Sequence, residues 1–228
     1  MERKHKKVVL HKGHLLYGLV TVVFIFILYF FVGKDSSFYF NKVRHSYLYN
    51  IFFEMQYSVN ILVSAAPYIY LYLLIMIIIK RFFYFEQFLF TALISQFFSS
   101  KLTNLLKIVF GRYWTETFTH GNLSLIKNKT YGFDFFHGDL EHASFPSGHT
   151  TVIFAVMTVL WIMYPRWRPF AIFWCSIVIL GLLGCNFHFP SDILAGAFIG
   201  IISAVFVIHA MQIYAKNIEG CSFQKKDE

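Results

Sequence analysis

The chain alternates long apolar runs with short polar segments, which is the pattern of a protein that crosses a membrane several times. The third run turns amphipathic after residue 100, where Lys101 and Lys107 appear, and Gly111 is a typical helix stop. The six runs cover residues 15–33, 55–79, 87–100 and onward, 150–165, 169–187 and 193–215. The pattern predicts six membrane-spanning helices, which would place both chain ends on one side.

Polar segments separate the predicted helices and end the chain. Residues 34–54 and 115–145 are expected to be loops, and Pro67 is expected to kink or interrupt the second helix. Residues 1–14 form a basic N-terminal segment, and residues 216–228 form a polar tail. The first apolar run is long, is followed by further runs and has no small-residue cleavage site after it. We therefore expect a retained first helix rather than a cleaved signal peptide.

Composition supports membrane embedding. Hydrophobic residues make up 57% of the 228-residue chain and charged residues only 14%, compared with about 25% charged in a typical soluble domain. The net charge of +8 raises the alternative of a nucleic-acid partner. The basic residues, however, are scattered over short segments between apolar runs, which indicates membrane topology instead. We expect residues 1–228 to form a single membrane domain with no nucleic-acid partner.

The distribution of Lys and Arg predicts the orientation. Twelve of them fall in segments that share a side with the N-terminus, and five fall in segments on the opposite side. In membrane proteins, short cytoplasmic segments carry the excess of Lys and Arg. Both termini are therefore expected in the cytoplasm, and the polar segments around Arg112, His149 and His188 are expected on the extracytoplasmic face.

The first candidate for chemistry is Pro146-Ser147-Gly148-His149, at the start of the fourth apolar run. Pro followed by Ser is a helix-start signal, with Ser147 as the N-cap. The unpaired N–H groups of a helix start bind anions, and Gly148 lets the backbone approach a ligand closely. His149 in the first turn could then give a proton to a leaving group. The alternative is a capped helix with an interfacial histidine that has no chemical role.

The second candidate is the pair His188 and Asp192, between the fifth and sixth runs. Ionisable side chains at such a position are costly in a membrane and mark a functional site by default. A histidine that donates one ring N–H to a carboxylate keeps its other nitrogen available as a nucleophile or a base. The structural alternative is that Ser191 or Asp192 caps the sixth helix after an entry turn at Pro190.

Two cations, Lys107 and Arg112, lie near the end of the third run. Snorkelling to the interface would explain either one alone. Residues five apart lie about 140° apart on an ideal helix, so the two converge only if the helix ends at Gly111. With two histidines, a carboxylate and a helix start, they would form a phosphate pocket. No metal is expected there, because His-Glu-x-x-His is absent and the cations would repel a metal ion.

Such a pocket allows two-step phosphoryl transfer. Attack by His188 on phosphorus would give a phosphohistidine, while His149 protonates the departing oxygen. Water activated by His149 would then release phosphate. The cations and the backbone amides would stabilise charge on the equatorial oxygens.

The order of these motifs resembles the type 2 phosphatidic acid phosphatases, whose fold is shared with vanadium haloperoxidases. The pattern of that family is Lys-x6-Arg-Pro, then Pro-Ser-Gly-His, then Ser-Arg-x5-His-x3-Asp. The second part is complete at residues 146–149, and the third part supplies His188 and Asp192. The resemblance covers about residues 50–215 and implies an all-α six-transmembrane-helix bundle.

The resemblance also implies a role for each site residue. His188 would be the nucleophile, Asp192 its orienting carboxylate and His149 the general acid. No metal or other cofactor would take part. The phosphate-binding residues would be Lys107, Arg112, Ser147 and Gly148.

Two parts of the pattern depart from the family. Arg112 comes two positions early, and Trp114 occupies the position of the family's arginine. In the third part, Gly181-Leu182 stand where the family has Ser-Arg. The pocket would lose one or two cations, so either the anion site is rearranged or activity is weakened or lost. The candidates for compensation are Asn186, His137 and His142.

The sequence leads to three hypotheses. The first is an enzyme that hydrolyses a lipid phosphate or pyrophosphate at the outer leaflet of a bacterial inner membrane. By resemblance, its substrate would be polyprenyl pyrophosphate, phosphatidylglycerol phosphate, phosphatidic acid or a lipid A phosphate. The second is a lipid phosphotransferase that uses the same phosphohistidine, and the third is a non-catalytic lipid-phosphate binder. The identity of the lipid and the oligomeric state stay open.

Overall fold

The computed structural model describes residues 12–81, 83–118 and 121–224, and among these it contains helices and isolated bridges but no β-strand. The predicted all-α class is therefore confirmed. Most of the predicted basic segment, and residues 225–228 of the predicted tail, lie outside the described residues. The elements are α1 (Lys12–Ile27), η1 (Leu28–Val32), α2 (Gly33–Arg44), α3 (Tyr49–Tyr57), α4 (Asn60–Ile78), α5 (Tyr84–Phe110), α6 (Leu125–Asn128), η2 (Leu140–His142), α7 (Gly148–Met163), η3 (Pro165–Trp167), α8 (Arg168–Gly184) and α9 (Pro190–Gln224).

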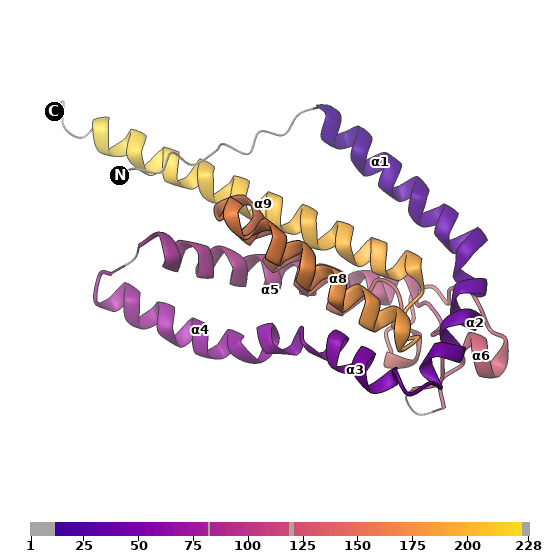
Figure 1. Ribbon diagram of the computed structural model, residues 1–228. Helices are drawn as coiled ribbons and strands as arrows, with labels where there is room; N and C mark the ends of the chain where they lie inside the picture. The colour runs from indigo at the N-terminus through magenta and orange to yellow at the C-terminus, as the bar shows by residue number, and fades with distance from the viewer. Residues whose placement is uncertain (1–11, 82, 119–120, 225–228) are drawn as a thin grey trace.

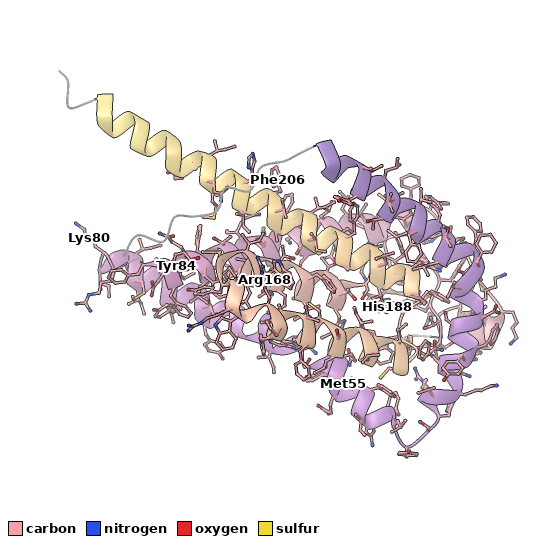
Figure 2. The ribbon with its side chains drawn as sticks, turned by 45° about the horizontal axis from the view of Figure 1, so that its top comes forward. Met55, Lys80, Tyr84, Arg168, His188 and Phe206 are labelled. Atoms are coloured by element: carbon pink, nitrogen blue, oxygen red, sulfur yellow. The ribbon has the colours of Figure 1, made fainter. Side chains whose placement is uncertain are left out.

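The long helices run back and forth along the bundle (Figure 1). α7 packs against α5, α8 and α9, while α3 packs against α8 and α1 contacts α9. α2 and α6 lie together at one end. His188 lies toward this end, whereas Lys80 and Tyr84 mark the opposite end (Figure 2). The polar segments that precede α7 and α9 therefore meet at a single end of the bundle.

By length and composition, four helical stretches in the described part of the chain could cross a membrane. All six predicted runs form helices, but the third and fourth do not meet this criterion. α7 has only 16 residues, and α5 carries polar and charged side chains along its length that lower its mean hydropathy. The fold alone thus supports four of the six predicted crossings. The four stretches are Leu16–Arg44, Tyr49–Ile78, Pro165–Gly184 and Pro190–Tyr214.

Two predicted boundaries are wrong, and the interruption that was one expectation for Pro67 is absent. The expected loop at residues 34–54 is largely helical, because polar composition without a proline does not stop a helix that continues from α1. Pro67 does not interrupt α4, whose break from α3 falls at the turn before Asn60. α9 continues past residue 215 to Gln224, since no proline or capping turn ends it.

Two glycines let α9 lie close against α7. A Cβ added at Gly196 would be 2.5 Å from the carbonyl oxygen of Ser147, and one at Gly200 would be 2.5 Å from that of Thr151. Glycines four residues apart are a common device for close contact between membrane helices. Because α7 and α9 begin at the two histidine motifs, this contact sets the distance between them.

We expect Gly200→Ala to destabilise the protein by about 1–3 kcal/mol, because the added methyl group forces a close contact apart. The measurement is thermal unfolding in detergent. Gly18→Ala is the matched control, since it also adds a methyl group within a helix but would meet the Phe198 ring at an ordinary 3.5 Å. Equal melting temperatures for the two variants would contradict this account of the α7–α9 contact.

Candidate functional site

One cavity of about 490 Å³ brings together residues from all three predicted motifs. It lies between α4, α5, α7 and the segment that precedes α9. Four of the seven predicted site residues line it, from three separate parts of the chain. These four are Lys107, Gly148, His149 and His188.

The start of α7 supplies the predicted anion-binding backbone. Ser147 is the N-cap, as predicted, and its Oγ accepts a hydrogen bond of 3.5 Å from the N–H of Thr150. The Ser147 side chain is fully buried and does not line the cavity. A Cβ at Gly148, by contrast, would meet nothing within 4 Å. Gly148 and His149 therefore face the cavity, with first-turn N–H groups that have no partner within the helix.

His188 and Asp192 form the predicted pair. The Nδ1 of His188 lies 3.6 Å from the Oδ2 of Asp192, slightly beyond an ordinary hydrogen bond. Oδ2 accepts hydrogen bonds from the hydroxyl of Ser144 at 2.7 Å and from the N–H of Phe189 at 3.1 Å. Asp192 is the third residue of α9, so its side chain bonds back to the residue before the helix. Neither Ser191 nor Asp192 is the N-cap, which corrects that alternative, although Asp192 does help to cap the helix.

The environment of His188 favours a neutral imidazole. Burial lowers the pKa of His188, and the Asp192 carboxylate opposes this effect by stabilising the charged form. With Nδ1 turned toward the carboxylate, Nε2 is the nitrogen left for chemistry. A neutral ring with its lone pair on Nε2 is the form that can attack phosphorus.

Arg112 lies on the far side of Asp192 and does not line the cavity. Gly111 ends α5 in the left-handed conformation with φ of 54°, as predicted, and turns the chain there. Arg112 is fully buried and pairs with the Oδ1 of Asp192. Lys107 remains on α5 at the cavity, where its Nζ donates to the carbonyl of Ala143 at 2.5 Å. Although α5 ends at Gly111, only Lys107 of the two cations lines the cavity, and Arg112 lies behind Asp192.

The departures from the family pattern have structural reasons. Trp114 forms a wall of the cavity, with its ring 5.3 Å from that of His188. A Cβ at Gly181 would be 2.4 Å from the backbone nitrogen of Gln56, so the missing side chain makes room for α3. Leu182 is fully buried in the hydrophobic core. Arginine at position 182 would place an unpaired charge in that core.

None of the three proposed compensating residues lines the cavity. The Oδ1 of Asn186 accepts a hydrogen bond from Ser37, and His137 and His142 pair with aspartates of their own loop. Lys107 is the only Lys or Arg that lines the cavity among the residues with described positions. Sequence reasoning missed Ser144, which no pattern signals. It also missed a polar stripe at helical spacing on α5, formed by Ser100, Thr103, Asn104 and Lys107.

Comparison with known proteins supports the resemblance. Residues 86–215 match the PAP2 superfamily, a span that includes every predicted site residue. Lipid A 1-phosphatase of Rhizobium etli is 34% identical over 115 residues, which are 50% of this chain and 44% of that protein. Lipid A 1-phosphatase of Rhizobium johnstonii is 34% identical over 105 residues, which are 45% and 39% of the two chains.

The matches cover less than half the length of each of these relatives. No solved structure matches the chain. The superfamily match, however, covers more than half of the chain and contains both histidine motifs. The chain therefore belongs to the PAP2 superfamily.

Proposed function

We propose that the protein is a membrane phosphatase that hydrolyses a lipid phosphate through a phosphohistidine on His188. The observation that carries this proposal is that His188, His149 and Lys107 line the same cavity. The names of the relatives favour a lipid A phosphate among the candidate substrates.

The mechanism has two steps. In the first, Nε2 of His188 attacks phosphorus, the bond to the leaving oxygen breaks, and His149 donates a proton to that oxygen. In the second, His149 takes a proton from water, the water oxygen attacks phosphorus, and the P–N bond breaks to release phosphate. Asp192 stabilises the positive imidazole ring, while Lys107 and the first N–H groups of α7 stabilise the charge on phosphate.

A second cavity supports a lipid substrate. It has a volume of about 480 Å³ and is lined almost entirely by apolar and aromatic side chains. Its α5 residues Phe85, Leu89, Ala92 and Gln96 continue the helical spacing of the polar stripe that ends at Lys107. α4 and α7 contribute residues to both cavities. The two cavities thus follow one another along the same helices, and the second would hold the acyl chains of a substrate whose phosphate lies at His188.

We expect Leu89→Trp to raise KM for a long-chain lipid phosphate about tenfold, because displacing roughly two methylene groups costs about 1.6 kcal/mol. A short-chain phosphate should be unaffected. Leu105→Trp is the matched control, since Leu105 is 57% exposed on the same helix and lines neither cavity. If Leu89→Trp changed the kinetics of both substrates equally, the acyl-chain assignment would be wrong.

The proposal includes six crossings of the inner membrane, with both termini cytoplasmic and the site extracytoplasmic. His188 lies toward the end of the bundle opposite Lys80 (Figure 2). The connections α4–α5 and α7–α8, away from the start of α7, carry the basic residues Lys80, Arg81, Arg166 and Arg168. A reporter fused after Ala215 tests the orientation. Activity of a reporter that works only in the periplasm would overturn it.

Phosphate release by the purified protein in detergent, with a chelator present, tests the function on a panel of lipid phosphates. We expect metal-independent release from at least one lipid. A phosphotransferase would instead yield a phosphorylated acceptor lipid with little free phosphate. A protein that binds lipid phosphates without any turnover would overturn the enzymatic proposal.

A further inference from the structure

We infer that Arg112 is a positioning residue, which holds Asp192 behind His188 and leaves phosphate to Lys107 and the start of α7. This inference rests on the proposed function, because it assigns Arg112 a role in the same reaction. It also gives the early arginine a different task from the phosphate contact that the family resemblance implies.

Both terminal nitrogens of the Arg112 guanidinium are bonded to protein groups, while its buried Nε has no hydrogen-bond partner among the described residues. Its Nη1 pairs with the Oδ1 of Asp192 and donates to the Oγ of Ser191 at 2.7 Å. Its Nη2 donates to the hydroxyl of Tyr131 at 3.1 Å. The other oxygen of Asp192 faces Ser144 and His188. Both carboxylate oxygens of Asp192 therefore have partners. Oδ1 contacts Arg112, and Oδ2 contacts Ser144 and faces His188.

An aromatic cage fixes the guanidinium. Its carbon lies 4.2 Å from the ring centre of Phe189 and 4.9 to 5.4 Å from three further rings. Such contacts stabilise a cation that is removed from water. The three further rings belong to Tyr29, Tyr131 and Phe133.

The aromatic cage connects the site to the N-terminal helical stretch through Tyr29. The Tyr131 hydroxyl donates to the carbonyl oxygen of Tyr29 at 2.6 Å, and Tyr29 lies in the π-helical turn η1. Burial raises the pKa of Tyr131 to about 12, so this hydroxyl keeps its proton. A chain of contacts thus runs from Tyr29 through Tyr131 and Arg112 to Asp192. It begins outside the segment that matches the superfamily.

The test separates phosphate affinity from turnover. Affinity for inorganic phosphate is measured by calorimetry, and kcat is measured on the best lipid phosphate, for Arg112→Met, Arg112→Lys and Lys107→Met. We expect Arg112→Met to lower kcat about 10–100-fold with phosphate affinity unchanged, and Arg112→Lys to restore part of kcat. Lys107→Met should weaken phosphate binding at least about tenfold.

A milder substitution, Tyr131→Phe, keeps the test valid if the Arg112 variants misfold. Tyr131→Phe removes only the hydroxyl and should lower kcat in the same direction by a smaller factor, again without a change in phosphate affinity. The inference is overturned if the Arg112 variants lose phosphate affinity as Lys107→Met does, or if Arg112→Met keeps the wild-type kcat. If the wild type turns over no lipid, the proposed function fails, while the calorimetry still decides whether Arg112 binds phosphate.

Discussion

His188→Ala should abolish phosphate release, with a fall in kcat of at least about 10³-fold. The reason is that no other described side chain can take over as nucleophile in the same place. Nδ1 of His188 faces Asp192, and the ring lines the cavity beside His149 and Lys107. Phosphate release from the lipid substrate is the measurement, on protein whose folding is checked by size-exclusion chromatography.

His137→Ala is the matched control for that substitution. His137 lies in the loop after α5, pairs with Asp134 and does not line the cavity. Its substitution should leave kcat within about twofold of the wild type. Residual activity above one-tenth of wild type in His188→Ala would rule out the phosphohistidine mechanism. Loss of activity in His137→Ala would instead revive the hypothesis that a loop histidine compensates for a missing cation.

His149→Ala should lower kcat about 10²–10⁴-fold on a lipid phosphate, because the departing alkoxide then leaves without a proton. The effect depends on the leaving group, and this dependence makes the prediction specific. An aryl phosphate, whose leaving group needs no proton, should form phosphoenzyme at a near-normal rate.

The second step should then become limiting in His149→Ala. Water attack also needs His149, so phosphoenzyme should accumulate when the variant turns over an aryl phosphate. The measurement is a rapid-quench experiment, in which a burst of released phenol would show that phosphoenzyme accumulates. An equal loss of rate for alkyl and aryl phosphates, with no burst, would show that His149 is not the general acid.

The local structure around the candidate site could be predicted from the sequence because it lies in short motifs. Pro146-Ser147-Gly148-His149 starts a helix, as Pro and Ser signal, and Gly111 ends one in the left-handed conformation that glycine favours. The apolar runs predicted helices because a membrane leaves the backbone few alternatives. These features depend on a few neighbouring residues, so a single sequence is enough to reveal them.

The features that the sequence did not reveal depend mostly on tertiary contacts. The sequence could not reveal the pairing of Arg112 with Asp192, because it depends on the turn at Gly111 and on a partner that lies 80 residues further along the chain. Ser144 reaches Asp192 from a loop without any periodic pattern. The helices α2 and α3 were missed because their polar faces resemble a loop in composition.

Trapping the intermediate is the most direct test of a phosphohistidine on His188. The His149→Ala variant is mixed with a ³²P-labelled aryl phosphate, quenched under alkaline conditions that preserve phosphohistidine, and digested for peptide mapping. We expect acid-labile label on the peptide that contains His188, and no label in the double variant that carries both His149→Ala and His188→Ala. Label on another residue, or steady turnover by the His149→Ala variant without any covalent label, would contradict a phosphohistidine on His188.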